Sequence, residues 1–201
     1  MAAKTILVCL MAYGLGCLSP GYWLVRWRCG IDIRTIGSGA TGAFNVGRVL
    51  KTPGFALTLL GDVLKGVLAL ALAYAFGLPP LARFLVLTAV VVGHDFPAQL
   101  GFRGGNGLAP GGGALLLLDP WLTLMLALFF CLSLPILAIL KALFKLPIRV
   151  YTPSKLTIVA APLLALLLGR GWLLALGLAA VVALILWTMW CDPRRRVQVV
   201  S

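Results

Sequence analysis

The chain has 201 residues, of which 62% are hydrophobic and 11% charged, and its mean hydropathy is +1.07. Because a soluble domain is about 25% charged, this composition excludes an ordinary soluble protein and indicates a membrane protein with little chain outside the bilayer. Seventeen Lys and Arg against five acidic residues give a formal net charge of +12. In a membrane protein, such an excess of cations is first explained by basic loops on the cytoplasmic side, and second by an anionic partner, either lipid headgroups or a phosphorylated substrate. Nucleic acid is a less favoured partner.

Cysteine and histidine usage excludes two further kinds of site. The five cysteines lie mostly within or beside apolar runs and form no CxxC pair, so we expect interior packing rather than a disulfide framework. Because His94 is the only histidine, a multi-histidine site is excluded, and we expect no metal.

Apolar runs predict seven helical segments. In chain order they are residues 4–25, 54–77, 81–97, 108–118, 121–140, 156–168 and 172–190. A helix needs about 20 residues to cross the hydrocarbon core, and the first run is a membrane helix by length, with a kink or end expected at Pro20. Residues 108–118 would rise only about 16 Å, so we expect a half-membrane helix there. These segments predict an all-α integral membrane protein in which residues 1–201 form a single polytopic domain.

The distribution of cations predicts how the chain crosses the membrane. An odd number of segments places the two termini on opposite sides. If the loop of residues 26–53 is cytoplasmic, only Lys4, Arg83 and Arg170 among the basic residues lie outside. Because cations favour the cytoplasmic side, we expect the N-terminus outside and the C-terminus in the cytoplasm.

Two glycine-rich stretches carry many of the polar residues. The first glycine loop, residues 37–42, is followed by Asn45 and Arg48, and the second glycine loop, residues 101–107, contains Arg103. Glycines let the backbone approach a ligand, and consecutive amides with cations nearby suit a phosphate. Either stretch alone is more simply a connection between membrane helices. Two such stretches, both expected at the cytoplasmic face, favour a shared phosphate site.

Two pairs of ionisable residues allow alternative interpretations. Asp62 and Lys65 are three residues apart and share a helix face, so they form an ion pair, or Lys65 reaches a phosphate while Asp62 orients it. His94 and Asp95 form an interfacial pair at a helix end, or a general base with its orienting carboxylate.

Three stretches resemble the bacterial acyl-phosphate:glycerol-3-phosphate acyltransferases (the PlsY family). They are GIDIRTIGSGATGAFNVGRVL, GDVLKG and GHDFPAQLGFRGGNGLAPGGGALL, in that order. The resemblance covers most of residues 5–168. It implies a seven-helix, multi-pass enzyme of the bacterial plasma (inner) membrane that transfers an acyl chain from acyl phosphate to glycerol 3-phosphate in phospholipid synthesis. It also implies that no cofactor is needed and that the partners are these two substrates and membrane lipids.

The resemblance supplies the expected site residues. Ser38, Asn45, Arg48, His94 and the glycines of the second loop match residues of the family motifs. The expected catalytic residues are Ser38, Asn45 and His94. The expected phosphate-binding residues are Gly37, Gly39, Arg48, Lys65, Arg103, Gly104, Gly105, Asn106 and Gly107.

The chain also departs from the family pattern. The family has Asn at Ala40, Thr at Phe44 and Lys at Asn106, and its third motif, a His-x-Glu-Asn cluster, is replaced near residues 191–194. An inactive or re-specialised membrane paralogue is therefore one alternative function. A small lipid or anion transporter is another, although such a protein would show paired repeats, which this sequence lacks.

Overall fold

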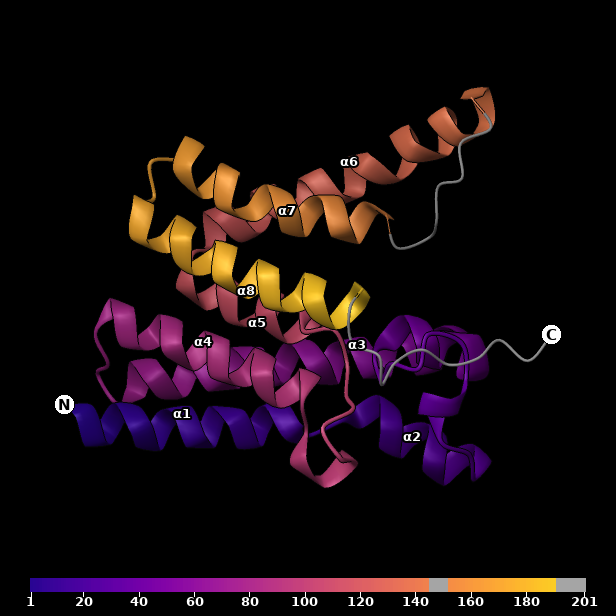
Figure 1. Ribbon diagram of the computed structural model, residues 1–201, viewed down its shortest axis with the longest axis horizontal. Helices are drawn as coiled ribbons and strands as arrows, with labels where there is room; N and C mark the ends of the chain where they lie inside the picture. The colour runs from indigo at the N-terminus through magenta and orange to yellow at the C-terminus, as the bar shows by residue number, and fades with distance from the viewer. Residues whose placement is uncertain (145–151, 191–201) are drawn as a thin grey trace. The chain divides into compact units, whose positions relative to one another are not determined.

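The computed structural model describes residues 1–144 and 152–190, and within these ranges every regular element is a helix (Figure 1). The elements are α1 Ala2–Cys17, α2 Pro20–Cys29, η1 Ile33–Thr35, α3 Ala43–Ala75, α4 Pro80–Asp95, η2 Ala98–Leu100, α5 Leu108–Leu118, α6 Pro120–Phe144, α7 Thr152–Leu167 and α8 Trp172–Trp190. In the described part of the chain, four stretches are long and apolar enough to cross a membrane: Ala2–Cys29, Ala43–Ala75, Pro80–Leu100 and Pro120–Phe144. The expected all-α class is confirmed.

The chain divides into two compact units. Among the described residues, the first unit contains 1–118 with 187–190, and the second contains 119–144 with 152–186. The expected single domain over residues 1–201 stays a prediction.

Glycines allow the helices of the first unit to cross closely. A Cβ atom on Gly16 of α1 would collide with the carbonyl oxygen of Val90 in α4. In the same way, a Cβ on Gly66 of α3 would collide with the carbonyl oxygen of Pro110 in α5. Small residues let membrane helices approach until their backbones touch, so these glycines account for the α1–α4 and α3–α5 contacts.

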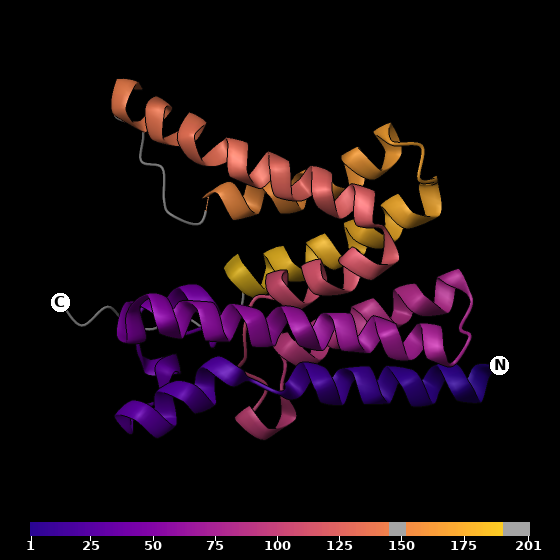
Figure 2. The same ribbon diagram turned by 180° about the vertical axis from the view of Figure 1, so that it is seen from behind.

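The expected first span is broken into α1 and α2. Pro20 has no amide hydrogen to continue the helix, and Leu18 ends α1 with ψ 118. The carbonyl oxygens freed at the break are satisfied from elsewhere in the unit: Lys65 donates to those of Gly16 and Leu18, and Gln99 to that of Cys17. Figures 1 and 2 show the segment that carries η2 crossing this break. A broken helix at membrane depth requires such internal partners.

The long helix α3 begins earlier than expected. The prediction for its apolar part was 54–77, whereas helical structure starts at Ala43 and includes residues assigned to the preceding loop. A break remains near the expected boundary, because Lys51 has φ 57 and ψ −155 just before Pro53. The short segment before the break carries Asn45 and Arg48, so it positions two of the expected site residues.

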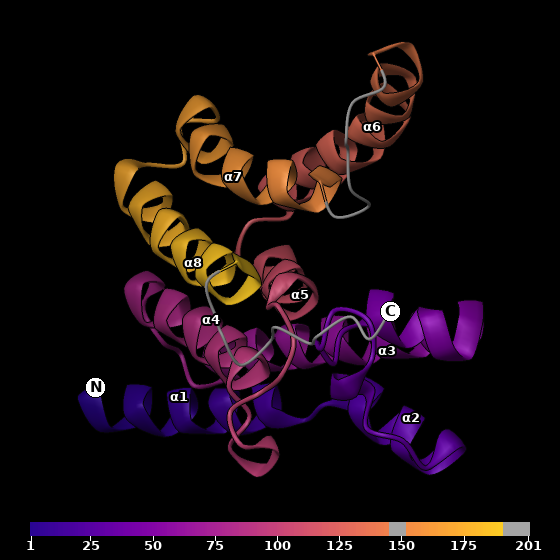
Figure 3. The same cartoon turned by 45° about the vertical axis from the view of Figure 1, so that its right-hand side comes forward.

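The second unit contains α6, α7 and most of α8, and α6 packs against α7. Asp119 caps α6, since its Oδ1 accepts from the Leu122 amide at 3.0 Å and Pro120 occupies the first helical position. Arg170, in the turn between α7 and α8, pairs with Asp119 at 3.1 Å (the turn is visible in Figure 3). The predicted linker 141–155 is helical at both described ends, and residues 145–151 lie outside the described part.

Candidate active site

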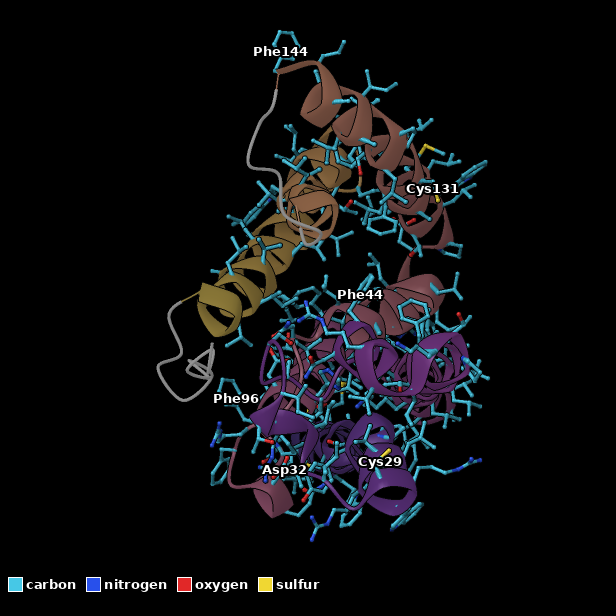
Figure 4. The ribbon with its side chains drawn as sticks, turned by 90° about the vertical axis from the view of Figure 1, so that its right-hand side faces the viewer. Cys29, Asp32, Phe44, Phe96, Cys131 and Phe144 are labelled. Carbon is cyan, nitrogen blue, oxygen red and sulfur yellow. The ribbon has the colours of Figure 1, made fainter. Side chains whose placement is uncertain are left out.

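The two glycine loops meet at one end of the first unit. The Thr41 amide donates to the carbonyl oxygen of Gly104 at 3.2 Å. A second link is the Arg34 side chain, which pairs with Asp32 at 2.7 Å and donates to the carbonyl oxygen of Leu100 at 2.5 Å. Asp32 and Phe96, labelled in Figure 4, come from the two connections that carry the loops, and both lie in this unit. The convergence expected from the sequence is therefore present.

Asn45 shapes the first glycine loop from within. Its side chain is 1% exposed, and its Nδ2 donates to the carbonyl oxygens of Ile33, Ile36 and Ala40 at 3.1, 2.9 and 2.9 Å. Its Oδ1 accepts from the Ser38 amide at 3.2 Å. Because both ends of the amide are used inside the protein, these contacts indicate a positioning role for Asn45, and its expected catalytic role stays a prediction.

Arg48 lies beside the same loop and is exposed. Gly37 has φ +56, and a Cβ there would meet Arg48 Nη1 at 2.8 Å. The absence of a side chain at residue 37 therefore lets the guanidinium lie against the loop. This places a permanent cation against Gly37, the residue before Ser38 in the chain.

The second glycine loop is tied to the end of α4. The Gly104 amide donates to the carbonyl oxygen of Asp95 at 3.1 Å, and the Gly105 amide to that of His94 at 2.9 Å. In the first loop, the Ser38 and Gly39 amides are likewise used internally. The amides of these four residues are therefore used inside the protein and are not available to an anion, which corrects the expected nest at these positions.

Asp62, Lys65 and His94 form a buried polar cluster. Their side chains are 2%, 3% and 3% exposed. Lys65 Nζ lies 2.9 Å from Asp62 Oδ1 and 2.7 Å from His94 Nδ1, and it also contacts the carbonyl oxygens of Gly16 and Leu18 at 3.0 and 2.7 Å. The Asp62–Lys65 ion pair is confirmed. Lys65 thus has four partners in the interior, which indicates a structural role, and its expected phosphate contact stays a prediction.

The Nδ1 atom of His94 contacts residues of α3, and the alternative in which Asp95 orients this ring stays a prediction. The imidazole Nδ1 contacts Lys65 at 2.7 Å and lies 3.5 Å from Asp62, so α3 supplies its partners. The other edge of the ring packs against Gly105, where a Cβ atom would collide with Nε2. The adjacent Asp95 is fully buried.

Burial divides the expected site residues into two layers. The buried layer contains Gly39, Asn45, Lys65, His94, Gly104, Gly105 and Gly107. The accessible layer contains Gly37, Ser38, Arg48, Arg103 and Asn106. Arg103 Nε has no hydrogen-bond acceptor among the described residues. The guanidinium of Arg34, by hydrogen bonding, and the charge of Arg103 hold the pKa of Asp32 below its ordinary value.

Comparison with known proteins identifies the family. A model of the family described as glycerol-3-phosphate acyltransferase matches residues 6–198. The chain belongs to this family. Glycerol-3-phosphate acyltransferase 1 of Desulfitobacterium hafniense (strain Y51) is 46% identical over 180 residues, which are 88% of this chain and 83% of that protein. The Streptococcus equi subsp. zooepidemicus (strain H70) acyltransferase is 36% identical over 183 residues, which are 91% of this chain and 84% of that protein.

Solved structures agree with this assignment. The crystal structure of PlsY, an integral membrane glycerol 3-phosphate acyltransferase, in its glycerol 3-phosphate form has a TM-score of 0.76 and 28% identity, covering 92% of this chain and 87% of that one. The lysophosphatidic acid form gives a TM-score of 0.74 at 27% identity, with the same coverage. The fold of this acyltransferase-family chain is thus that of an integral membrane protein.

Several residues that organise this acyltransferase-family site were missed from sequence. Thr41, Arg34 and Gln99 connect segments that are far apart in the chain, and nothing in their local sequence indicates their partners. The Asp62–Lys65 spacing was a usable signal, but their contact with His94 depends on how α3 and α4 pack. The region of the family's third motif, residues 191–194, lies outside the described residues.

Proposed function

We propose that this chain transfers an acyl group from acyl phosphate to the 1-hydroxyl of glycerol 3-phosphate and forms lysophosphatidic acid. Family membership supports the reaction class. The observation that carries the proposal is the Thr41–Gly104 contact, because it brings two glycine loops together with Arg48 and Arg103 beside them. We place the enzyme in the bacterial plasma membrane, where its acyl donor and product dissolve.

The accessible layer suits two phosphorylated substrates. Acyl phosphate and glycerol 3-phosphate both bring anionic phosphate to the site, and two arginines supply permanent charge in a planar geometry that matches phosphate oxygens. Arg48 lies against Gly37, and Arg103 belongs to the second loop. Asn106 adds an amide that donates without charge. The acyl chain would enter from the bilayer between helices.

The reaction needs little from the protein beyond position and charge. The hydroxyl oxygen of glycerol 3-phosphate attacks the carbonyl carbon of acyl phosphate, and the carbonyl carbon–phosphate oxygen bond breaks. The hydroxyl proton passes to the departing phosphate. The Ser38 hydroxyl would stabilise the oxyanion that develops, and the arginines would hold the two substrates in line. His94 need not act as a base in this scheme.

A phosphate-release assay tests the function. Purified full-length protein in nanodiscs is given palmitoyl phosphate and glycerol 3-phosphate, and both phosphate and lysophosphatidic acid are measured. We expect release that depends on glycerol 3-phosphate. Arg48→Ala should abolish it, whereas Arg28→Ala, which removes an exposed arginine of α2, should leave it nearly unchanged.

The same assay separates the alternatives. A wild-type protein that makes no product with any acyl phosphate would be the inactive paralogue, and equal losses in the two arginine variants would mean that these cations serve topology alone. No observation in the described structure favours the paralogue or the transporter.

A further inference from the structure

The proposed reaction assigns no role to the buried cluster of Asp62, Lys65 and His94. We propose that Lys65 and Asp62 are positioning residues that hold His94 as the neutral tautomer with its proton on Nε2, and so keep the second glycine loop in place for acyl transfer. The catalytic part of this inference rests on the proposed function. The tautomer itself can be tested without any reaction.

Counting hydrogens around Lys65 assigns the tautomer. An ammonium group has three hydrogens and no lone pair. The carbonyl oxygens of Gly16 and Leu18 can only accept, so they take two of these hydrogens and leave the third for His94 Nδ1. Asp62 pairs with the ammonium by charge, since its Oδ1 accepts no hydrogen bond among the described residues. The 2.7 Å contact from Nζ to His94 Nδ1 is therefore favourable only if Nδ1 also accepts. A ring that accepts at Nδ1 carries its proton on Nε2.

The position of the ammonium is determined by three separate elements. Asp62 is on the same helix as Lys65, Gly16 and Leu18 belong to the break after α1, and His94 lies near the end of α4. The cluster therefore connects the broken first helix to the histidine. Because every member is nearly inaccessible to solvent, the contacts between them are not weakened by competing water.

The protonated edge of the ring faces the second glycine loop. A Cβ at Gly105 would occupy the position of Nε2, so the imidazole fills the space that a side chain would take there. The Gly105 amide also donates to the His94 carbonyl oxygen at 2.9 Å. Residue 105 is thus glycine because His94 packs on it. A change in the ring's orientation would move the loop that carries Arg103 and Asn106.

Because His94 is the only histidine, its tautomer can be measured directly. The full-length protein is labelled with ¹⁵N-histidine in nanodiscs at pH 7, and the two ring nitrogens are observed by NMR. We expect one nitrogen to be protonated and assigned to Nε2, and Nδ1 to be unprotonated. A proton on Nδ1, or a ring protonated on both nitrogens, would overturn the proposal.

A double variant tests the role of the cluster. Asp62→Asn with Lys65→Met removes both charges together, so that neither is left buried without its partner. We expect the single tautomer to be lost and kcat to fall about a hundredfold, while KM for glycerol 3-phosphate changes less than about threefold. An unchanged ¹⁵N spectrum, or a loss confined to KM, would overturn the positioning role.

Gly105→Ala disturbs the packing of His94 on the second glycine loop and leaves the charges of Asp62 and Lys65 in place. It should displace the ring, alter the ¹⁵N spectrum and lower kcat, whereas Gly14→Ala, at an exposed site of α1 with open space, should change neither. An unaltered spectrum in Gly105→Ala would contradict the packing argument. If the wild type shows the expected tautomer but no acyl transfer, the tautomer stands and the proposed function is what fails.

Discussion

At the scale of single residues, the polar side chains of the site are of two kinds: buried ones that support its structure, and others that are accessible to solvent. Asn45 and Lys65 each use all of their polar contacts inside the protein, although both resemble ligand-binding residues in the sequence. Arg48 remains exposed and Arg103 half-buried. A buried polar group must be satisfied internally, so burial distinguishes a positioning residue from one that binds substrate.

The residue at position 106 should set the affinity for the acceptor. Asn106→Lys adds a cation to the accessible layer, where the family pattern has lysine. A new charged contact with a dianionic phosphate would contribute on the order of 1–3 kcal/mol, which lowers KM for glycerol 3-phosphate about tenfold to a hundredfold. Steady-state kinetics at varied acceptor concentration measure the change.

Asn106→Met is the matched control, since it is of similar length to lysine but carries no charge. The gain with lysine should shrink as salt is raised, and methionine should show no such dependence. If lysine weakens activity with glycerol 3-phosphate, Asn106 selects an acceptor with less negative charge.

The Asp32–Arg34 pair should make stability depend on pH. Hydrogen bonding to Arg34 lowers the pKa of Asp32 in the folded state, so the pair stabilises the fold above the ordinary Asp pKa of about 4. This contribution is lost as the pH falls through the lower folded-state value. Asp32→Asn should therefore be less stable than wild type at pH 7, by less than about 1 kcal/mol because the pair is partly exposed.

Thermal unfolding of both proteins in detergent between pH 7 and pH 3 provides the measurement. The two midpoints should converge on acidification. If the difference between the two midpoints widens at low pH, Arg34 does not stabilise the fold through the Asp32 carboxylate.

At the scale of the elements, glycine contacts determine how closely the helices cross. Gly16→Leu would place a side chain against the backbone of Val90 in α4 and should destabilise the first unit by about 1–3 kcal/mol. Gly14→Leu, two residues earlier on the same helix, points into open space and should be nearly neutral. Unfolding midpoints in detergent compare them, and equal effects would mean that helix propensity outweighs the crossing.

At the scale of the whole molecule, the membrane orientation is the prediction that remains to be measured. The contact between the glycine loops places both at one end of the first unit, as the predicted orientation requires. In a cysteine-free background, an impermeant maleimide added to whole cells should label Arg83→Cys and not Arg28→Cys. The opposite pattern would reverse the orientation.

Sequence alone determined the helical class, α5 as a short helix over Leu108–Leu118, the limits of α8 and the family. These follow from the length and polarity of local runs and from the order of motifs. The tertiary structure decided what each polar residue does. Lys65 contacts the broken helix and His94, and the amides of Gly104 and Gly105 bond to the end of α4. Such roles depend on which groups are buried together, and burial arises only when helices distant in the chain pack.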